Sequence, residues 1–314
     1  MKRKKRNTKN IKKSSNIIFV VLVILLVVFY IYKTSTLKDN NIEKNNTKKE
    51  DNQEEKIDSD ESIKKEDEST PYKKTSNFKL ENLNRYQAYK EKNPNLDYET
   101  VVTYVNIGLD YDFYDYIKDA DLSKDILVLT NKYSKLPDGY EPSDLEEISS
   151  EYFINGNTLV RNLRKEAKEA FEKLSKASIE NGTPVYGQSA YRPYSMQESL
   201  YNQEVQRSGV KGADSDTARP GHSEHQTGLA IDVASEKWGN MYSFDKSSSY
   251  QWMNENAHKY GFILRYRKEY ENIHGYIYEG WHYRYVGVKV ATDIHDNYPN
   301  MTYDEYYYKF IDKK

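Results

Sequence analysis

The stretch Gly221–Val233, GHSEHQTGLAIDV, decides the fold and raises the first chemical question. It holds two histidines, His222 and His225, and runs into the short apolar segment Leu229–Ala234, LAIDVA, which one acid, Asp232, interrupts. A short apolar run of this kind predicts a buried β-strand. An ionised carboxylate is costly inside a core unless it is paired or bound to a cation. Asp232 therefore predicts a positively charged partner.

The absence of cysteine limits what that partner can be. A chain of 314 residues without cysteine has no disulfide framework, no thiolate zinc site and no catalytic thiol, so a metal ion must be bound through nitrogen and oxygen. His225 stands seven residues before Asp232, and Gly228 lets the loop between them turn back towards the strand. A third ligand is predicted in YEGWHYRYVG, where Glu279 precedes His282 by three residues.

The spacing of Glu279 and His282 needs a local irregularity. Positions i and i+3 of an ideal strand face opposite sides, but Gly280 can supply a bulge that turns both side chains inward. Two histidines, one aspartate and an open fourth position describe a catalytic zinc site, with Glu279 as the base that takes the proton of the attacking water. By spacing alone, the alternative that these histidines are structural stays open.

The N-terminal quarter has the composition of a membrane anchor and a spacer. Residues 17–32, IIFVVLVILLVVFYIY, are uncharged and with their flanks predict a single transmembrane signal anchor over residues 14–35. The basic segment 1–13 places the N-terminus in the cytoplasm and the rest outside the cell, and a removed signal peptide is the alternative. Residues 36–75 are rich in Lys, Glu, Asp, Asn and Ser, which predicts a disordered charged stalk. A catalytic domain, residues 76–314, would then lie in the cell-wall space at the membrane.

Charge argues against one class of partner. Residues 1–13 hold eight Lys or Arg and no acid, so the rest of the chain has 39 basic against 49 acidic residues. Phosphate neutralisation needs a clustered basic surface, so we expect no nucleic-acid binding.

The order of the expected helices and strands in the domain predicts an α+β fold with a mainly antiparallel sheet flanked by helices, because helices and strands are mixed without βαβ regularity. The expected helices span residues 82–92, 98–107, 159–180, 195–206, 248–260, 287–297 and 302–311, and the expected strands span 125–133, 183–192, 229–234, 262–266 and 281–287.

Three segments together resemble one known family. SEHQTGLAID is similar to the motif SxHxxGxAxD, EGWH to the motif ExWH, and SAYRPYSMQ to the SxYR segment of VanY-type D-alanyl-D-alanine carboxypeptidases. These are zinc peptidases related to the D-Ala-D-Ala dipeptidases and to the hedgehog fold, and the resemblance runs from about Asn82 to the C-terminus. It implies that His225, Asp232 and His282 bind Zn²⁺ and that Glu279 is the general base.

The same resemblance assigns the substrate side of the site. It implies that Arg192 binds or polarises the substrate near the scissile peptide, while Gln197 and Ser223 help to hold the terminal carboxylate. A cation and hydroxyl or amide donors are the groups that read a free carboxylate, which agrees with these residue types. His222 stands where the family commonly has tyrosine, so we expect it at the rim of the site. Trp281 and Arg284 are expected as structural neighbours, and His258, His274 and His295 as packing or surface residues.

The function implied is removal of the terminal D-alanine from peptidoglycan stem peptides by metal-activated water. One alternative within the family is an L,D-carboxypeptidase acting on tetrapeptide stems, and another enzyme alternative is an endopeptidase that cuts cross-bridges. A non-catalytic cell-wall-binding module with the same fold is the alternative from a different class. The D,D-carboxypeptidase is the favoured interpretation, although the pocket that receives the penultimate residue is not located from the sequence.

Overall fold

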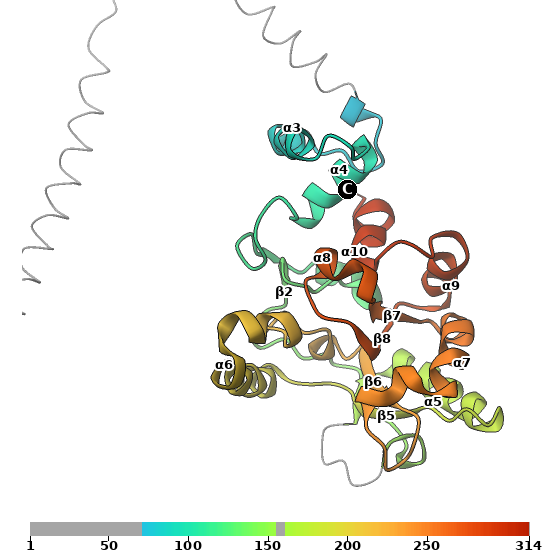
Figure 1. Ribbon diagram of the computed structural model, residues 1–314. Helices are drawn as coiled ribbons and strands as arrows, with labels where there is room; N and C mark the ends of the chain where they lie inside the picture. The colour runs from blue at the N-terminus through green and yellow to red at the C-terminus, as the bar shows by residue number, and fades with distance from the viewer. Residues whose placement is uncertain (1–70, 155–160, 314) are drawn as a thin grey trace, which may run out of the picture. The chain divides into compact units, whose positions relative to one another are not determined.

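The computed structural model describes residues 71–154 and 161–313 of the chain (Figure 1). The predicted anchor, residues 14–35, and nearly all of the predicted stalk lie outside these residues. In the part of the chain that is described, no helix is both long enough and apolar enough to span a membrane. Tyr72, which the prediction placed in the stalk, is buried and stacks on Tyr86 with ring centroids 5.8 Å apart.

A four-stranded sheet in the order β5-β6-β8-β7 carries the predicted site. All three pairings are antiparallel, which confirms the predicted α+β class. The central strand β6 is buried along its whole length. The four strands are β5 (Tyr186–Ser189), β6 (Ala230–Ala234), β7 (Phe262–Tyr266) and β8 (Glu279–Tyr285).

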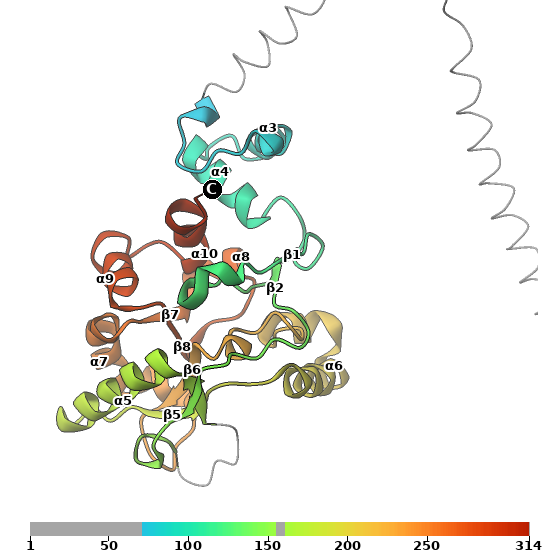
Figure 2. The same cartoon turned by 180° about the vertical axis from the view of Figure 1, so that it is seen from behind.

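Helices lie on both sides of this sheet. Figures 1 and 2 show α6 to one side of the sheet and α5, α7 and α9 to the other. Phe171 of α5 packs on Phe262 of β7 with ring centroids 6.2 Å apart, which joins that helix to the sheet through the largest core cluster. The helices are α3 (Leu83–Lys92), α4 (Tyr98–Ile107), α5 (Lys165–Glu180), α6 (Tyr194–Asp216), α7 (Ser248–Asn256), α8 (Glu271–His274), α9 (Val288–Asn297) and α10 (Tyr303–Tyr306).

Side-chain caps fix the starts of two helices. Asp97 accepts a hydrogen bond of 2.8 Å from the Thr100 N–H, which confirms the predicted cap of α4. Thr302 and Glu305 form a reciprocal capping box at the start of α10. This cap sets the direction in which α10 points Asp304 into the protein.

One predicted strand, residues 125–133, is wrong. A 3-10 turn over Leu122–Leu127 replaces its start, and Asn131 forms an isolated β-bridge with Ser134; the neighbouring strands are β1 (Lys118–Asp119) and β2 (Ser134–Lys135). Val128 and Leu129 are buried, so the apolar signal did report burial. The Arg284 guanidinium donates hydrogen bonds of 3.0 and 2.8 Å to the carbonyls of Ile126 and Val128. A buried side chain thus occupies carbonyls that another strand would otherwise pair.

Other boundaries shift for local reasons. The predicted helix 159–180 begins at Lys165, because β4 (Asn162–Arg164) pairs with β3 (Leu145–Glu147) before it. The helix predicted over 195–206 continues to Asp216 across a break at Gly209, where φ is 74°. The predicted helices 248–260 and 302–311 change into a 3-10 turn after Asn256 and a π turn after Tyr306.

Candidate active site

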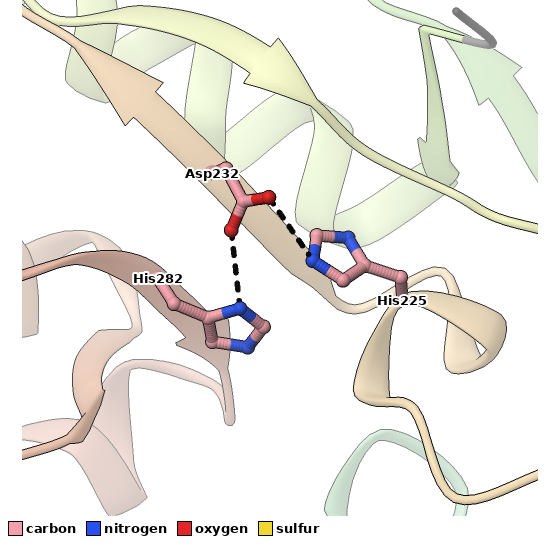
Figure 3. A group of neighbouring side chains, drawn as sticks. All are labelled: His225, Asp232 and His282. Atoms are coloured by element: carbon pink, nitrogen blue, oxygen red, sulfur yellow. Dashed lines mark hydrogen bonds and ion pairs between the residues drawn. The ribbon is translucent and has the colours of Figure 1, made fainter. Parts of the chain in front are cut away.

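Three side chains meet where β6, β8 and the loop before β6 come together (Figure 3). His225 Nε2 lies 3.3 Å from Asp232 Oδ2, and His282 Nδ1 lies 3.1 Å from Asp232 Oδ1. One ligand atom from each residue lies within 4.8 Å of the other two, and all three side chains are buried. The structure therefore brings the three predicted ligands together around one point.

The sheet register and a tight turn produce this meeting. Asp232 pairs directly with His282 across β6 and β8, and with Ser189 on β5. Gly228 adopts φ 66°, and its N–H bonds to the His225 carbonyl at 3.2 Å, so the loop folds back onto the strand as predicted. A side chain at Gly228 would be strained in this left-handed conformation.

A bulge in β8 brings Glu279 to the same site. The register with β7 shifts between the pairs Leu264↔Tyr283 and Tyr266↔Glu279, in the segment that contains Gly280. A Cβ at Gly280 would lie 2.5 Å from the Tyr278 hydroxyl and 2.8 Å from the Asp245 Cβ, so a larger residue would have to displace these side chains. Glu279 Oε2 consequently lies 3.6 Å from His282 Nδ1.

Hydrogen bonds on the outer side of each imidazole select its tautomer. His225 Nδ1 lies 2.8 Å from the Ala190 carbonyl, which only an N–H can satisfy, so Nε2 faces Asp232 with its lone pair. His282 Nε2 lies 3.2 Å from Glu224 Oε2, which leaves Nδ1 to face Asp232. Such outer partners are the usual means of orienting metal-binding histidines. Two imidazole nitrogens and one carboxylate, with no thiolate, fit a divalent ion such as zinc and leave a position for water or substrate.

The electrostatics favour a bound cation. Burial raises the pKa of Asp232, but the charge and hydrogen bonds of His225 and His282 outweigh it and hold the pKa well below its ordinary value. Burial lowers the pKa of His282, yet its bonds to two carboxylates raise the pKa to about 9. Burial also raises the pKa of Glu279 to about 8, against the opposing charge of His282. A bound cation would take the place of the proton on His282 and favour the ionised form of Glu279.

A cavity of about 690 Å³ opens onto these groups. It is lined by all seven residues predicted for the site: Arg192, Gln197, Ser223, His225, Asp232, Glu279 and His282.

Arg192 is held in place at the cavity wall by its neighbours. It donates hydrogen bonds to Gln197 Oε1 at 2.8 Å and to the Ser189 hydroxyl at 3.2 Å, and it lies 3.8 Å from Asp232. The Gln197 amide in turn donates to the Ala218 carbonyl at 2.7 Å. Gln197 is thus placed to orient Arg192, and its contact with a substrate carboxylate, like that of Ser223, stays a prediction.

The prediction that His222 lies at the rim of the site is wrong. His222 is 2% exposed and is not among the described residues that line the cavity. Its Nδ1–H donates to the Asn131 carbonyl at 2.7 Å, and its ring packs against the edge of Tyr114 at 5.0 Å. Burial, opposed by this hydrogen bond, lowers the pKa of His222 to about 4. His222 turns inward because the Asn131 carbonyl gives its imidazole a buried partner.

The remaining neighbours behave largely as predicted. Arg284 is fully buried, whereas Trp281 lines the cavity and packs on Tyr242 at 5.2 Å. His274 is buried, and its Nε2–H donates to the Arg267 carbonyl at 3.0 Å. His258 and His295 stack on each other at 3.7 Å.

Sequence reasoning missed the charges behind His282. Glu224 occupies an unspecified position of the SxHxxGxAxD motif, yet it is fully buried against His282 and two arginines. The buried position of Arg265 could have been predicted, because it is the one charged residue in the apolar strand FILRY. Like Asp232, Arg265 is a charged residue in an apolar strand and therefore requires a partner of opposite charge.

These features define a class of site, a buried centre of two histidines and one aspartate beside a carboxylate, at the floor of a polar cavity. This is the arrangement of a metal-dependent hydrolase.

The family model described as D-alanyl-D-alanine carboxypeptidase, VanY, matches residues 160–288. The chain is 41% identical over 188 residues to YodJ of Bacillus subtilis, a protein provisionally named as a carboxypeptidase, covering 59% of this chain and 68% of YodJ. It is 31% identical over 178 residues to a D-alanyl-D-alanine carboxypeptidase of Enterococcus faecalis, covering 54% of this chain and 61% of that relative.

A solved structure of the LdcB LD-carboxypeptidase superposes with a TM-score of 0.57 at 38% identity, covering 62% of this chain and 91% of that one. The chain belongs to the VanY-type D-alanyl-D-alanine carboxypeptidase family.

Proposed function

We propose that this protein is a zinc-dependent carboxypeptidase that removes the terminal D-alanine from peptidoglycan stem peptides. The observation that carries the proposal is that Glu279 and Arg192 lie beside the three predicted ligands and line the same cavity. Family membership supports the peptidase class.

Each protein group has a definite task in this proposal. His225, Asp232 and His282 would hold the ion. A zinc ion there would supply a Lewis acid that polarises the scissile carbonyl and makes water more acidic, and its charge would lower the pKa of Glu279. Glu279 would accept the proton of the attacking water and return it to the leaving amine. Arg192 would stabilise the negative charge that develops on the carbonyl oxygen.

A second candidate is the L,D-carboxypeptidase, and one feature of the cavity wall favours it. Glu204 and Asp216 both line the cavity, and Arg207 lies between them, 2.7 Å from the first and 3.6 Å from the second. Two carboxylates around one guanidinium leave a negative wall, which suits the side-chain amine of a penultimate diamino acid. The similarity to the LdcB LD-carboxypeptidase points the same way.

Defined substrates separate these possibilities. The purified protein would be given a pentapeptide stem ending in D-Ala-D-Ala and a tetrapeptide stem with a diamino acid before its single D-Ala, and released D-alanine would be measured. The same stems with an amidated C-terminus serve as controls, because an endopeptidase would not need the free carboxylate. Release from the first stem indicates a D,D-carboxypeptidase, and release from the second an L,D-carboxypeptidase. No release from either by zinc-loaded protein would favour the binding module and contradict the proposal.

We also propose that residues 14–35 anchor the protein in the cell membrane, with the catalytic domain in the cell-wall space. The support is the uncharged run 17–32 behind a basic N-terminus. Membrane fractionation, followed by protease treatment of wall-stripped cells, tests this. A domain that stays protected from external protease would contradict it.

A further inference from the structure

A closed group of buried charges lies directly behind His282. Glu224 Oε2 accepts from His282 Nε2 at 3.2 Å, while Glu224 Oε1 accepts from Arg265 Nε at 2.8 Å and from Arg284 Nη1 at 3.1 Å. The side chains of Glu224, Arg265 and Arg284 are 0% exposed. Both oxygens of Glu224 are thus engaged, so its carboxylate cannot rotate.

The group continues into elements far away in the sequence. Arg265 Nη1 donates to Asp304 Oδ2 at 2.7 Å, and Asn131 Nδ2 donates to Asp304 Oδ1 at 2.6 Å. Asp304 belongs to α10, and Asn131 precedes β2, so both lie outside residues 160–288 that match the family. A chain of hydrogen bonds therefore joins the C-terminal helix to a predicted metal ligand.

The charges in this group balance one another. Glu224 and Asp304 are two carboxylates, and Arg265 and Arg284 are two guanidiniums, all without access to water. A buried ion is tolerable only when it is paired and hydrogen-bonded on all sides. The direct contact of this group with the predicted metal ligands is the hydrogen bond that Glu224 accepts from His282 Nε2.

We infer that Glu224, held by Arg265, Arg284 and Asp304, is a positioning residue that fixes His282 as the tautomer with its proton on Nε2 and its lone pair on Nδ1. This inference rests on the proposed function, because the lone pair on Nδ1 matters only if His282 binds the ion. Outer partners of this kind commonly change metal affinity by about 10- to 100-fold.

Replacing Glu224 by glutamine would reverse the tautomer without changing the shape. The two arginines are donors only, so they select the carbonyl oxygen of the new amide. The NH₂ group would then face His282 Nε2, which must act as an acceptor and move its proton to Nδ1. The lone pair would point away from Asp232. Glu224→Gln should therefore weaken zinc binding by about 10- to 100-fold.

Zinc affinity of the full chain, measured by competition with a chromogenic chelator, tests the inference. The variants are Glu224→Gln, the charge-balanced pair Glu224→Gln with Arg265→Gln, and Glu255→Gln on the exposed face of α7 as the matched control. The thermal midpoint of each metal-free protein is measured in parallel. We expect weaker zinc binding in both Glu224 variants, a midpoint that recovers partly in the charge-balanced pair, and an unchanged control.

Two results would overturn the inference. Recovery of wild-type zinc affinity in the charge-balanced pair would mean that Glu224 only neutralises arginines, and wild-type affinity in Glu224→Gln alone would mean that it does not position His282. If the single variant fails to fold, nitrogen NMR of the zinc-loaded wild-type protein decides, since the inference requires the His282 proton on Nε2. A wild-type chain that binds no zinc would instead overturn the proposed function, and this inference with it.

Discussion

His282 lies between two groups of buried charges that are built in opposite ways. In front of it, two acids and one arginine face a cavity. Asp232 and Glu279 lie 3.1 and 3.6 Å from His282, and Arg192 lies 3.8 Å from Asp232. Behind it, the side chains around Glu224 form salt bridges of 2.7 to 3.1 Å with equal numbers of acids and arginines. The open group lacks a cation and a substrate, whereas the closed group balances its charges internally and leaves only Arg265 Nη2 without a hydrogen-bond partner among its described ions. Buried charge alone therefore does not identify a reactive site. Unequal numbers of acidic and basic side chains beside a cavity do.

The largest effect should come from removing one of the three predicted metal ligands. His225→Ala should lose stoichiometric zinc and D-alanine release together, because two of the three donor atoms cannot hold the ion at the same affinity. His222→Ala, a histidine three residues earlier, should keep its zinc. Metal analysis after dialysis measures the zinc content of both variants. An equal fall in the two would contradict the assignment of His225, and not His222, as a zinc ligand.

Glu279→Gln should show the next largest effect. It removes the proton acceptor and keeps the side-chain volume, so D-alanine release should fall by about 10²- to 10⁴-fold while the zinc content stays that of the wild type. Steady-state kinetics with metal analysis provide the measurement, and the exposed Glu255→Gln is the control. Near wild-type activity with full zinc would show that another group takes the proton.

Arg192→Lys should lower D-alanine release by about 10²- to 10³-fold, because lysine keeps a charge but lacks the fork that contacts Gln197 and Ser189 together. Gln197→Ala should act through Arg192 and cause a smaller fall. Comparing kcat and KM for the two variants tests this order. A larger loss for Gln197→Ala would mean that Gln197 contacts the substrate itself.

The last effect concerns the free energy of unfolding. It involves Asn131, at the far end of the hydrogen-bonded chain that starts at Glu224, where Asn131 accepts a hydrogen bond from His222. The pKa of His222 falls to about 4, through burial and the nearby charges of Lys135, Arg219 and Lys132, against an ordinary value of about 6.5. Below pH 6.5 the unfolded chain takes up a proton that the folded chain does not. The free energy of unfolding should therefore fall by up to about 3 kcal/mol as the pH drops from 6.5 to 4.

Urea unfolding at several pH values between 7 and 4 measures this dependence. His222→Gln keeps an N–H donor for the Asn131 carbonyl and cannot titrate, so its slope over that interval should be shallower. A slope identical to that of the wild type would assign the acid sensitivity to other groups.

Sequence reasoning succeeded where a local pattern reports a local cause. The single acid in LAIDVA, the glycine after the loop and the cap at Asp97 each have one simple structural consequence, and β6, Gly228 and α4 follow it. The seven predicted site residues share one cavity because the three motifs lie at or beside β5, β6 and β8, which are neighbours in the sheet.

It failed where a distant side chain decides. The residues near Val128 do not predict that the Arg284 guanidinium will donate a hydrogen bond to the Val128 carbonyl. The residues near His222 likewise do not predict its hydrogen bond to the Asn131 carbonyl. Glu224 was missed because its partners, Arg265 and Arg284, come from strands about 40 to 60 residues later. Long-range pairing of buried charge leaves no periodic trace in the sequence.

The most direct test of the central claim is a zinc titration of chelator-treated protein, with D-alanine release from a stem peptide measured at each step. The account predicts no release from the metal-free protein and full recovery at about one zinc per chain. Release that persists after zinc has been removed would contradict it.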